Sequence, residues 1–323
     1  MAEGIAAPGV AFLPSDRAGW ARPRSAGFIW ATLSLMIFSG WFVITRFSVT
    51  HELRIWDILA LRFGVGAVLL APTILRPGSR LPIAAWGEGL LFCLLWGLPF
   101  VLLVALGIRL TSAAEAASVA PAAMPVFAGI VSSLVLGERQ GKARWLGYGA
   151  IVLGLICLVE AGAADHGAPN PIGLLALLGA SLLWAVYTIV FRRSGLSPMQ
   201  AAALICTWSA VLFVPIYLLV GLSRLSLASP SELAFQVIYQ GVLMSCVAAA
   251  AFNRAVALLG PSAATAIIAL LPAVASILAI PVLGEVPLPA QWTAITAIAI
   301  GVCLAAKRPP TRLAFPNRSA KGE

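Results

Sequence analysis

The segment VLGERQGKARW, residues 135–145, returns 147 residues later as VLGEVPLPAQW, residues 282–292. The copies share Val, Leu, Gly, Glu, Ala and Trp at six of eleven positions, but the Arg139, Lys142 and Arg144 of the first copy have neutral counterparts in the second. One segment, kept once with its positive charge and once without it, indicates that the two copies lie in different surroundings.

The composition describes a polytopic membrane protein. Apolar residues make up 61% of the 323 residues and charged residues only 10%, which is not the composition of a soluble globular domain. Ten stretches are long and apolar enough to cross a hydrocarbon core of about 30 Å as helices. These predicted spans, one to ten, are residues 26–45, 56–75, 84–108, 112–136, 144–160, 171–191, 199–221, 232–258, 262–283 and 288–306. We expect an all-α integral membrane protein with no extramembrane catalytic domain.

The distribution of Lys and Arg predicts the orientation. With ten spans both tails lie on one side, and 16 of the 21 Lys and Arg residues fall there; Arg46, Arg54, Arg109 and Arg224 fall on the other side, and Arg62 inside span two. Cytoplasmic loops carry an excess of these residues, so we expect a multi-pass plasma (inner) membrane protein with both termini in the cytoplasm. The net charge of +9 is dispersed among loops, so no nucleic-acid partner is expected.

The two copies of the opening segment lie in loops on opposite sides, the first between spans four and five and the second between spans nine and ten. A unit of five helices is inverted when it is repeated, because it crosses the membrane an odd number of times. The inner copy therefore keeps its cations and the outer copy lacks them. We predict an N-terminal tail over 1–25, repeats over 26–160 and 171–306, a linker over 161–170 and a C-terminal tail over 307–323.

The repeat extends beyond this segment. Pro125 pairs with Pro272 at the same offset, Ser112-Ala113-Ala114 pairs with Ser262-Ala263-Ala264 at an offset of 150, and Trp41 pairs with Trp184 in the first helices. A small-residue helix start, a mid-helix Pro and a closing Gly-Glu (Gly137-Glu138, Gly284-Glu285) thus occur in both halves.

With Arg62 in span two, this pattern resembles the ten-helix EamA-type members of the drug/metabolite transporter superfamily, over roughly residues 28–306. The resemblance implies an inverted-repeat transporter, often an exporter of amino acids or related metabolites, among which aromatic amino acid exporters are one subgroup. It also implies a central cavity lined mainly by helices three, four, eight and nine.

Pro125, Pro272 and Arg62 are candidate functional residues on physical grounds. Each Pro removes a helical hydrogen bond and bends its helix at an interior point, either to shape a cavity or only as a packing kink. Arg62 must snorkel, pair or face water, because an unpaired charge within a span is costly. It serves either structural pairing or the binding of a substrate carboxylate or phosphate.

We expect the substrate site near the bilayer midplane between the two halves, with help from helices one and six. A few polar groups in an apolar wall are typical of small-molecule sites, although cross-helix hydrogen bonding and packing explain the same residues without a substrate. The polar candidates are Tyr239, Gln240, Ser245, Asn253 and Thr265. The aromatic candidates are Trp96, Phe100, Trp184 and Tyr187.

Other chemistries find little support in the sequence. The five Cys residues all fall within spans without CxxC spacing, and the two His residues fall outside them, so neither a metal nor a cofactor is expected. No acidic residue lies at mid-span where a proton relay would place one, and no ATP-binding motif is present. The oligomeric state stays open.

These features predict a secondary transporter or facilitator that exports small, partly apolar metabolites such as amino acids. The alternative is an exchanger of phosphorylated solutes, such as sugar phosphates or nucleotide sugars, which would need several cations deep in the cavity; only Arg62 meets that need. An intramembrane enzyme would need a buried polar cluster, which the sequence does not offer.

Overall fold

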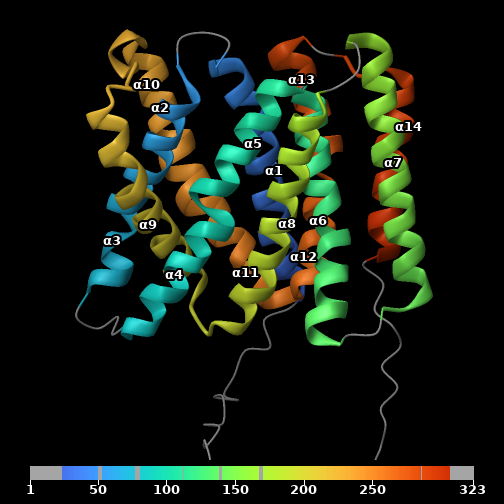
Figure 1. The fold of residues 1–323 in the computed structure, drawn as a ribbon, viewed down its shortest axis with the longest axis horizontal. Coiled ribbons are helices and arrows are strands. Elements are labelled where there is room, and N and C mark those ends of the chain that lie inside the picture. The colour runs from blue at the N-terminus through green and yellow to red at the C-terminus, as the bar shows by residue number, and fades with distance from the viewer. Residues whose placement is uncertain are drawn as a thin grey trace, which may run out of the picture.

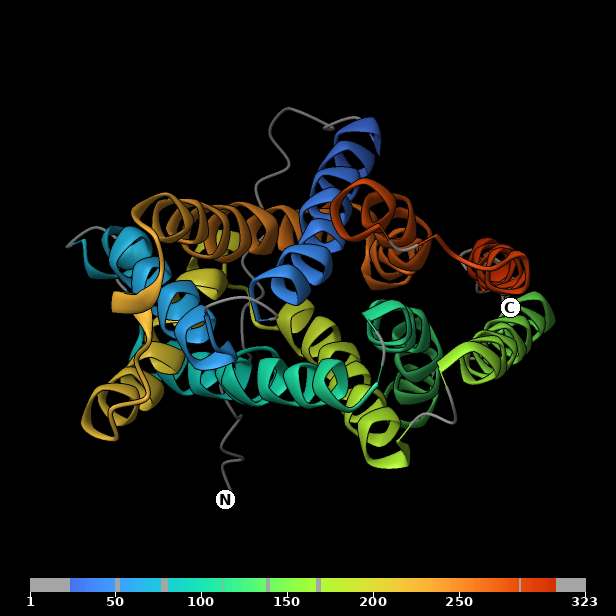
Figure 2. The ribbon, with the colours of Figure 1, turned by 90° about the horizontal axis from the view of Figure 1, so that it is seen from above.

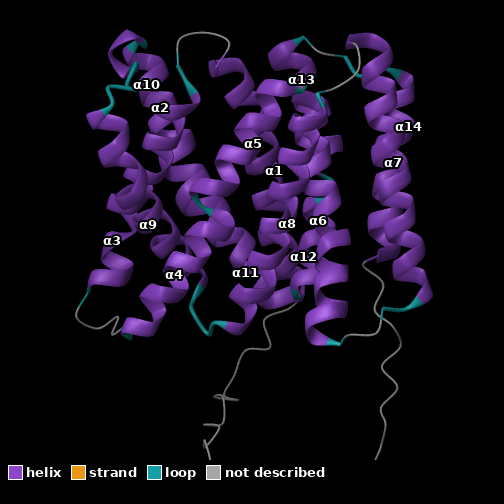
Figure 3. Ribbon diagram, in the orientation of Figure 1, coloured by secondary structure: helices purple, strands orange, loops and turns teal. Residues whose placement is uncertain are grey.

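A computed structural model describes residues 24–49, 53–76, 81–111, 113–137, 140–166, 170–284 and 286–305. These residues form helices and short connections, with no strand among them (Figure 3). Nine helical segments are long and apolar enough to span a membrane, and Pro289–Ala305 is a shorter tenth. The predicted all-α membrane fold is confirmed.

Six spans are continuous helices. They are α1 (Arg24–Val49), α6 (Ala113–Leu136), α7 (Lys142–His166), α8 (Pro171–Arg193), α9 (Pro198–Leu219) and α14 (Pro289–Ala305). The other four consist of shorter segments. Span two is α2 (Ile55–Ala60), η1 (Leu61–Val65) and α3 (Gly66–Leu75); span three is α4 (Ile83–Trp96) and α5 (Leu98–Leu110). Span eight is α10 (Pro230–Gln236), η3 (Val237–Ala248) and α11 (Ala249–Leu259); span nine is α12 (Pro261–Ile268) and α13 (Leu271–Leu283). A short 3₁₀ turn, η2 (Leu225–Leu227), precedes α10.

Helix packing follows the inverted repeat. Helix α1 of the first half packs against α11 and α13 of the second half. Its counterpart in the second half, α8, packs in the same way against α5 and α6 of the first half. Counterparts also pair with each other, α3 with α9 and α7 with α14, the latter pair standing at one edge of the molecule (Figure 2). Exchanging each helix for the one five spans later therefore reproduces the arrangement. The ten spans form two inverted halves.

The repeated Gly of the opening segment has a local backbone role. Gly137 and Gly284 both adopt left-handed φ values, 65° and 68°, where they follow α6 and α13. Glycine is favoured at this position because it has no Cβ to clash. The two helices end at opposite ends of the molecule (Figure 1), as the inversion requires. Glu138 and Glu285 lie outside the described residues.

The repeated prolines behave differently in the two halves. Pro125 lies inside the continuous α6, where it was expected. Pro272 instead lies in the first turn of α13, after span nine breaks at Ala269 and Leu270. The first turn of a helix needs no N–H from Pro, so the interior bend expected at Pro272 is corrected to a break between two helices.

Candidate functional site

Four spans depart from regular α-helix near mid-length. Span three breaks at Gly97 and span nine at Ala269–Leu270, while η1 and η3 are π-helical and contact each other. A Cβ added at Gly97 would lie 2.5 Å from the Ser209 hydroxyl and 2.6 Å from the Cys93 carbonyl, so the break requires glycine. Broken helices near mid-membrane and π-segments both mark functional sites in membrane proteins.

These irregular segments meet around a central cavity. Its volume is about 20 Å³, enough for a water molecule, which needs roughly 10–15 Å³, but not for a metabolite. Trp96 and Phe100 flank the Gly97 break, and Leu271 begins α13. The remaining lining residues are Phe38, Trp41, Phe42, Arg62, Ala120, Trp184 and Met244. The structure is therefore a closed state around its centre.

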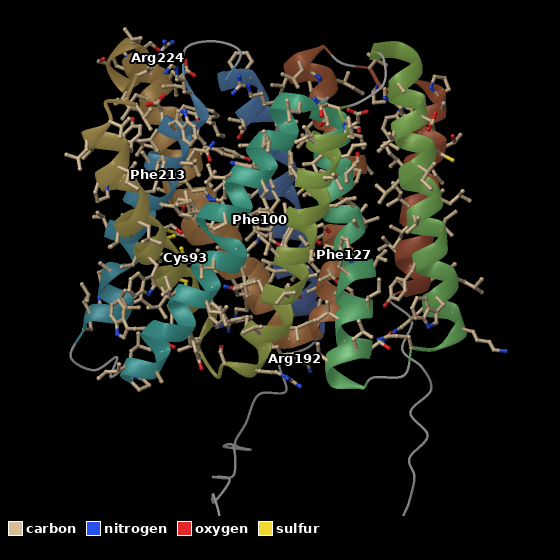
Figure 4. All side chains as sticks on the ribbon, in the orientation of Figure 1. Cys93, Phe100, Phe127, Arg192, Phe213 and Arg224 are labelled. Atoms are coloured by element: carbon tan, nitrogen blue, oxygen red, sulfur yellow. The ribbon has the colours of Figure 1, made fainter. Side chains whose placement is uncertain are left out.

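Aromatic rings fill the wall of this central cavity. Trp96 stacks on Tyr187 with ring centroids 4.6 Å apart and on Trp184 at 5.9 Å. Phe38 meets both tryptophans edge-on, and Phe100 meets Trp184 at 5.5 Å. Figure 4 places Phe100 at mid-height in the molecule. All four predicted aromatic residues lie together here.

Two hydrogen-bond donors at the cavity have no partner. The indole N–H groups of Trp96 and Trp184 are buried and bond to no acceptor in the described residues. An unsatisfied buried donor costs about 1–3 kcal/mol, which an acceptor oxygen on a bound solute would offset.

Arg62 supplies the positive charge. Its side chain is only 6% exposed and lines the central cavity, with its guanidinium carbon 5.5 Å from the ring centroids of both Trp41 and Phe63. No carboxylate among the described residues forms an ion pair with it. A cation in this position favours an anionic solute group.

Two of the predicted polar residues, Gln240 and Ser245, bond to residues of the cavity wall without lining the cavity themselves. Gln240 accepts a hydrogen bond from the Trp41 indole at 3.0 Å and donates to Gln236 at 3.2 Å. The Ser245 hydroxyl lies 2.5 Å from the Arg62 carbonyl and 2.9 Å from the Gln240 carbonyl, joining η3 to η1. Both residues therefore position Trp41 and the Arg62 backbone.

The other three predicted polar residues lie elsewhere. Asn253 accepts a hydrogen bond from the Tyr187 hydroxyl at 2.8 Å and donates to the Pro198 carbonyl at 3.3 Å. The Tyr239 hydroxyl donates to the Ile37 carbonyl at 2.8 Å. Thr265 and Pro125 line a separate cavity of about 20 Å³. None of the five uncharged polar candidates is among the residues that line the central cavity.

The remaining residues that line the central cavity were not predicted from the sequence; they are Phe38, Trp41, Phe42, Ala120, Met244 and Leu271. Two signals were available for the residues of α1. Trp41 pairs with Trp184 in the repeat, and Phe38, Trp41, Phe42 and Thr45 recur at the spacing of one helix face. Met244 and Leu271 carry no such mark, because their position depends on η3 and on the break in span nine.

The two ends of the central cavity differ. We call the end where α1 begins and α14 ends the lower end, after its place in Figure 1. Toward that end Phe92 and Phe191 pack on Tyr187, whose hydroxyl donates to Asn253, so buried side chains fill this end. Toward the upper end a cleft of about 670 Å³ reaches Thr45. The closure at the lower end is called the lower seal.

Two inverted halves around a central cavity at broken helices are the arrangement of a membrane transporter scaffold. The chain belongs to the EamA-like transporter family, whose model matches residues 25–160 and 171–306.

Relatives agree with this assignment. The uncharacterized transporter YwfM of Bacillus subtilis is 25% identical over 250 residues, covering 73% of this chain and 82% of its own. The uncharacterized inner membrane transporter YedA of Escherichia coli is 27% identical over 271 residues, covering 80% and 85%. A probable terminal-alkyne amino-acid exporter of Streptantibioticus cattleyicolor is 29% identical over 181 residues, covering 54% and 58%.

The fold also matches a solved crystal structure. The TM-score is 0.62 at 20% sequence identity, and the match covers 87% of this chain and 96% of the other. At this identity the likeness shows the fold alone.

Proposed function

We propose that this transporter is a secondary transporter or facilitator that exports small, partly apolar carboxylates, such as amino acids, across the inner membrane. One observation carries the proposal: Arg62 and the two unpartnered indole N–H groups of Trp96 and Trp184 line the same cavity, beside aromatic rings. Together they offer one positive charge and two donors to a carboxylate, and ring faces to an apolar side chain.

The broken helices add to the attraction for an anion. α5 begins at Leu98 and α13 at Leu271, both beside the central cavity. The N-terminal end of a helix carries a partial positive charge, and half-helices in other inverted-repeat transporters point this end at anionic substrate groups.

Alternating access gives a mechanism for these parts. In the closed state described here, the lower seal and the aromatic wall leave about 20 Å³ at the centre. Rocking of one half against the other would open the same site to each end in turn. Binding then depends on expansion of the central cavity, with Trp96, Trp184 and Arg62 as the groups that first meet the solute.

The alternative is an exchanger of phosphorylated solutes, such as sugar phosphates or nucleotide sugars. A phosphate group carries about −1.5 to −2 charge at pH 7, so its site would need several cations. Arg62 is the one cation among the described residues that line the central cavity. The name of the relative from Streptantibioticus cattleyicolor, a probable amino-acid exporter, also favours amino acids over phosphorylated solutes.

The charge distribution supports termini in the cytoplasm. Arg76, Lys142, Arg144, Arg192 and Arg193 lie toward the lower end, and Arg54, Arg109 and Arg224 toward the upper end, as Figure 4 shows for Arg192 and Arg224. This excess supports a cytoplasmic lower end, because cytoplasmic loops are enriched in Lys and Arg. Cys substitution at Gly141 and at Pro287 tests it with an impermeant thiol reagent on intact cells; only the Pro287→Cys loop should react, and equal reaction of both would refute the inverted orientation.

Transport by purified protein in liposomes tests the function. Labelled amino acids, nucleosides and sugar phosphates would be compared with and without a pH gradient, with protein-free liposomes as the control. The proposal predicts movement of amino acids, with apolar side chains preferred. Movement of sugar phosphates without amino acids would reverse the choice between the two functions.

A further inference from the structure

A cleft at the upper end has the size of a metabolite site. Its volume is about 670 Å³, within the roughly 300–1,000 Å³ typical of small-molecule sites. It lies between the end of α1, the start of α2 and the second half of α5, the last two labelled in the upper part of Figure 1. The central cavity, at about 20 Å³, has no such room in this state.

The described residues that line this upper cleft carry positive charge. Arg54 and Arg109 both line it, and none of the described residues in its lining is acidic. Glu52, next to Leu53, lies outside the described residues. Asp57, next to the cleft residue Trp56 in the chain, is buried and accepts hydrogen bonds from the Tyr217 hydroxyl and from the backbone N–H groups of Arg224 and Arg54. Its carboxylate is thus occupied, and the two guanidinium groups are left to face the cleft.

A buried hydroxyl and an aromatic ring complete the lining. Thr45 is fully buried, and its Oγ1 has no hydrogen-bond partner among the described residues. Trp56 supplies a ring on the same cleft. Two cations, an unsatisfied hydroxyl and an indole ring match a small organic acid with an apolar body.

This upper cleft lies next to the central cavity. Thr45 follows Trp41 and Phe42 on α1 by about one turn, near 5.4 Å, and those two residues line the central cavity. On α5 the cleft residue Leu102 lies just beyond Phe100, which also lines the central cavity. The two spaces are therefore neighbours along both α1 and α5, with Phe42 and Phe100 on the side of the central cavity nearest the cleft.

We propose that the upper cleft is a second binding site, where Arg54 and Arg109 hold the carboxylate of the transported organic acid on its way past Phe42 and Phe100. This proposal rests on the proposed function, since it takes the same class of solute. Its role is to collect the anion outside the central cavity, so that the centre exchanges solute with the cleft.

Thiol modification inside the upper cleft tests its charge without any transport. Ala105, which lines the cleft, is replaced in the full chain (Ala105→Cys), and the protein is placed in phosphatidylcholine nanodiscs. An anionic sulfonatoethyl and a cationic trimethylammonioethyl methanethiosulfonate are compared at that site by peptide mass spectrometry. The ratio of anionic to cationic rate should fall roughly five- to tenfold on Arg54→Gln with Arg109→Gln, the effect of two charges at about 8 Å in partly screened solvent.

Arg193→Gln is the matched control, because it removes an exposed cation at the lower end. It should leave the ratio unchanged. A ratio that is the same in the parent and the double variant, or that falls equally with Arg193→Gln, overturns the assignment of charge to the cleft.

Binding is tested by protection of the same introduced thiol. N-acetyl-L-phenylalanine, an anion, should slow its modification, whereas the neutral N-acetyl-L-phenylalanine amide should protect at least fivefold less well. The difference should vanish in the double variant. Equal protection by both compounds, or a difference that survives without the two arginines, refutes the carboxylate site.

A lipid headgroup is the other source of an anion at this position. Nanodiscs with about a third phosphatidylglycerol separate the sources: a solute site keeps its protection there, and a complete loss would assign the cleft to lipid and overturn the proposal. Thiol modification does not require transport, so the two proposals can fail separately. If the arginine substitutions leave the modification ratio unchanged while the liposomes transport amino acids, only the cleft site is refuted. If the anion protects the thiol as expected but the liposomes transport no amino acid, the proposed transport function is refuted instead.

Discussion

The lower seal depends on one buried hydroxyl, and Tyr187→Phe removes it with little change of shape. The Tyr187 hydroxyl donates to Asn253 at 2.8 Å, and both residues are fully buried. Asn253 keeps only its bond to the Pro198 carbonyl, at 3.3 Å. Loss of such a hydrogen bond, with an acceptor left unsatisfied, costs about 1–2 kcal/mol.

That cost applies to the sealed state, because water reaches Asn253 once the seal opens. The equilibrium between sealed and open states should therefore shift toward open by about 5- to 30-fold. Ser34 reports the opening. It is fully buried on the face of α1 that also carries Phe38, one turn closer to the lower end.

The assay is the rate at which a water-soluble maleimide modifies Ser34→Cys, with and without Tyr187→Phe. The rate should rise by the same 5- to 30-fold factor. Tyr217→Phe is the matched control, because it removes a buried tyrosine hydrogen bond, to Asp57, at the upper end. A rate that Tyr187→Phe leaves unchanged, or that Tyr217→Phe raises equally, would refute the lower seal.

Three further substitutions test the centre. Arg62→Gln should raise the KM for amino acid carboxylates in liposomes at least tenfold and leave the KM for their amides constant, because Arg62 has no carboxylate partner to lose among the described residues. An equal rise in KM for carboxylates and amides would contradict a role of Arg62 in binding the carboxylate. Met244→Ala should join the central cavity to its neighbour of about 10 Å³, since Met244 lines both, and should destabilise the protein by about 2–5 kcal/mol. Competition assays should then show a shift toward amino acids with bulkier side chains; an unchanged ranking of amino acids would count against Met244 as part of the cavity wall. Gly66→Ala should lower the melting temperature, because its Cβ would lie 2.6 Å from that of Ser245. Gly87→Ala, with nothing within 4 Å, should not; equal effects would contradict a tight contact between the start of α3 and η3.

The overall architecture was readable from the sequence because it depends on length, hydropathy and charge. A helix in a membrane must satisfy its own backbone hydrogen bonds, so a long apolar stretch predicts a span without further knowledge. The segment repeated at residues 135–145 and 282–292 also predicted the inversion. The first copy has Arg139, Lys142 and Arg144 where the second has neutral residues, as the positive-inside rule requires of loops on opposite sides.

The details of the site were less readable, because they depend on departures from regular helix. Gly97 and the turn at Ala269–Leu270 look like ordinary positions in apolar runs, and the π-geometry of η3 leaves no sequence mark. Arg62 and the aromatic residues were predictable from their cost or size in a membrane. The uncharged polar residues predicted to line the cavity do not line it. Gln240 bonds to the Trp41 indole, Ser245 to the Arg62 carbonyl and Tyr239 to the Ile37 carbonyl.

Transport by variants of the two central tryptophans tests the substrate site most directly. Trp96→Ala and Trp184→Ala would be reconstituted beside Trp145→Ala, a control that changes a ring 52% exposed on the outer surface of α7. Each variant is first matched for the amount of folded protein in the membrane. Both central substitutions should change KM or the ranking of amino acids, while Trp145→Ala should transport like the parent. Parent-like transport by both central variants, beside a loss of transport in well-expressed Trp145→Ala, would contradict the central cavity as the substrate site.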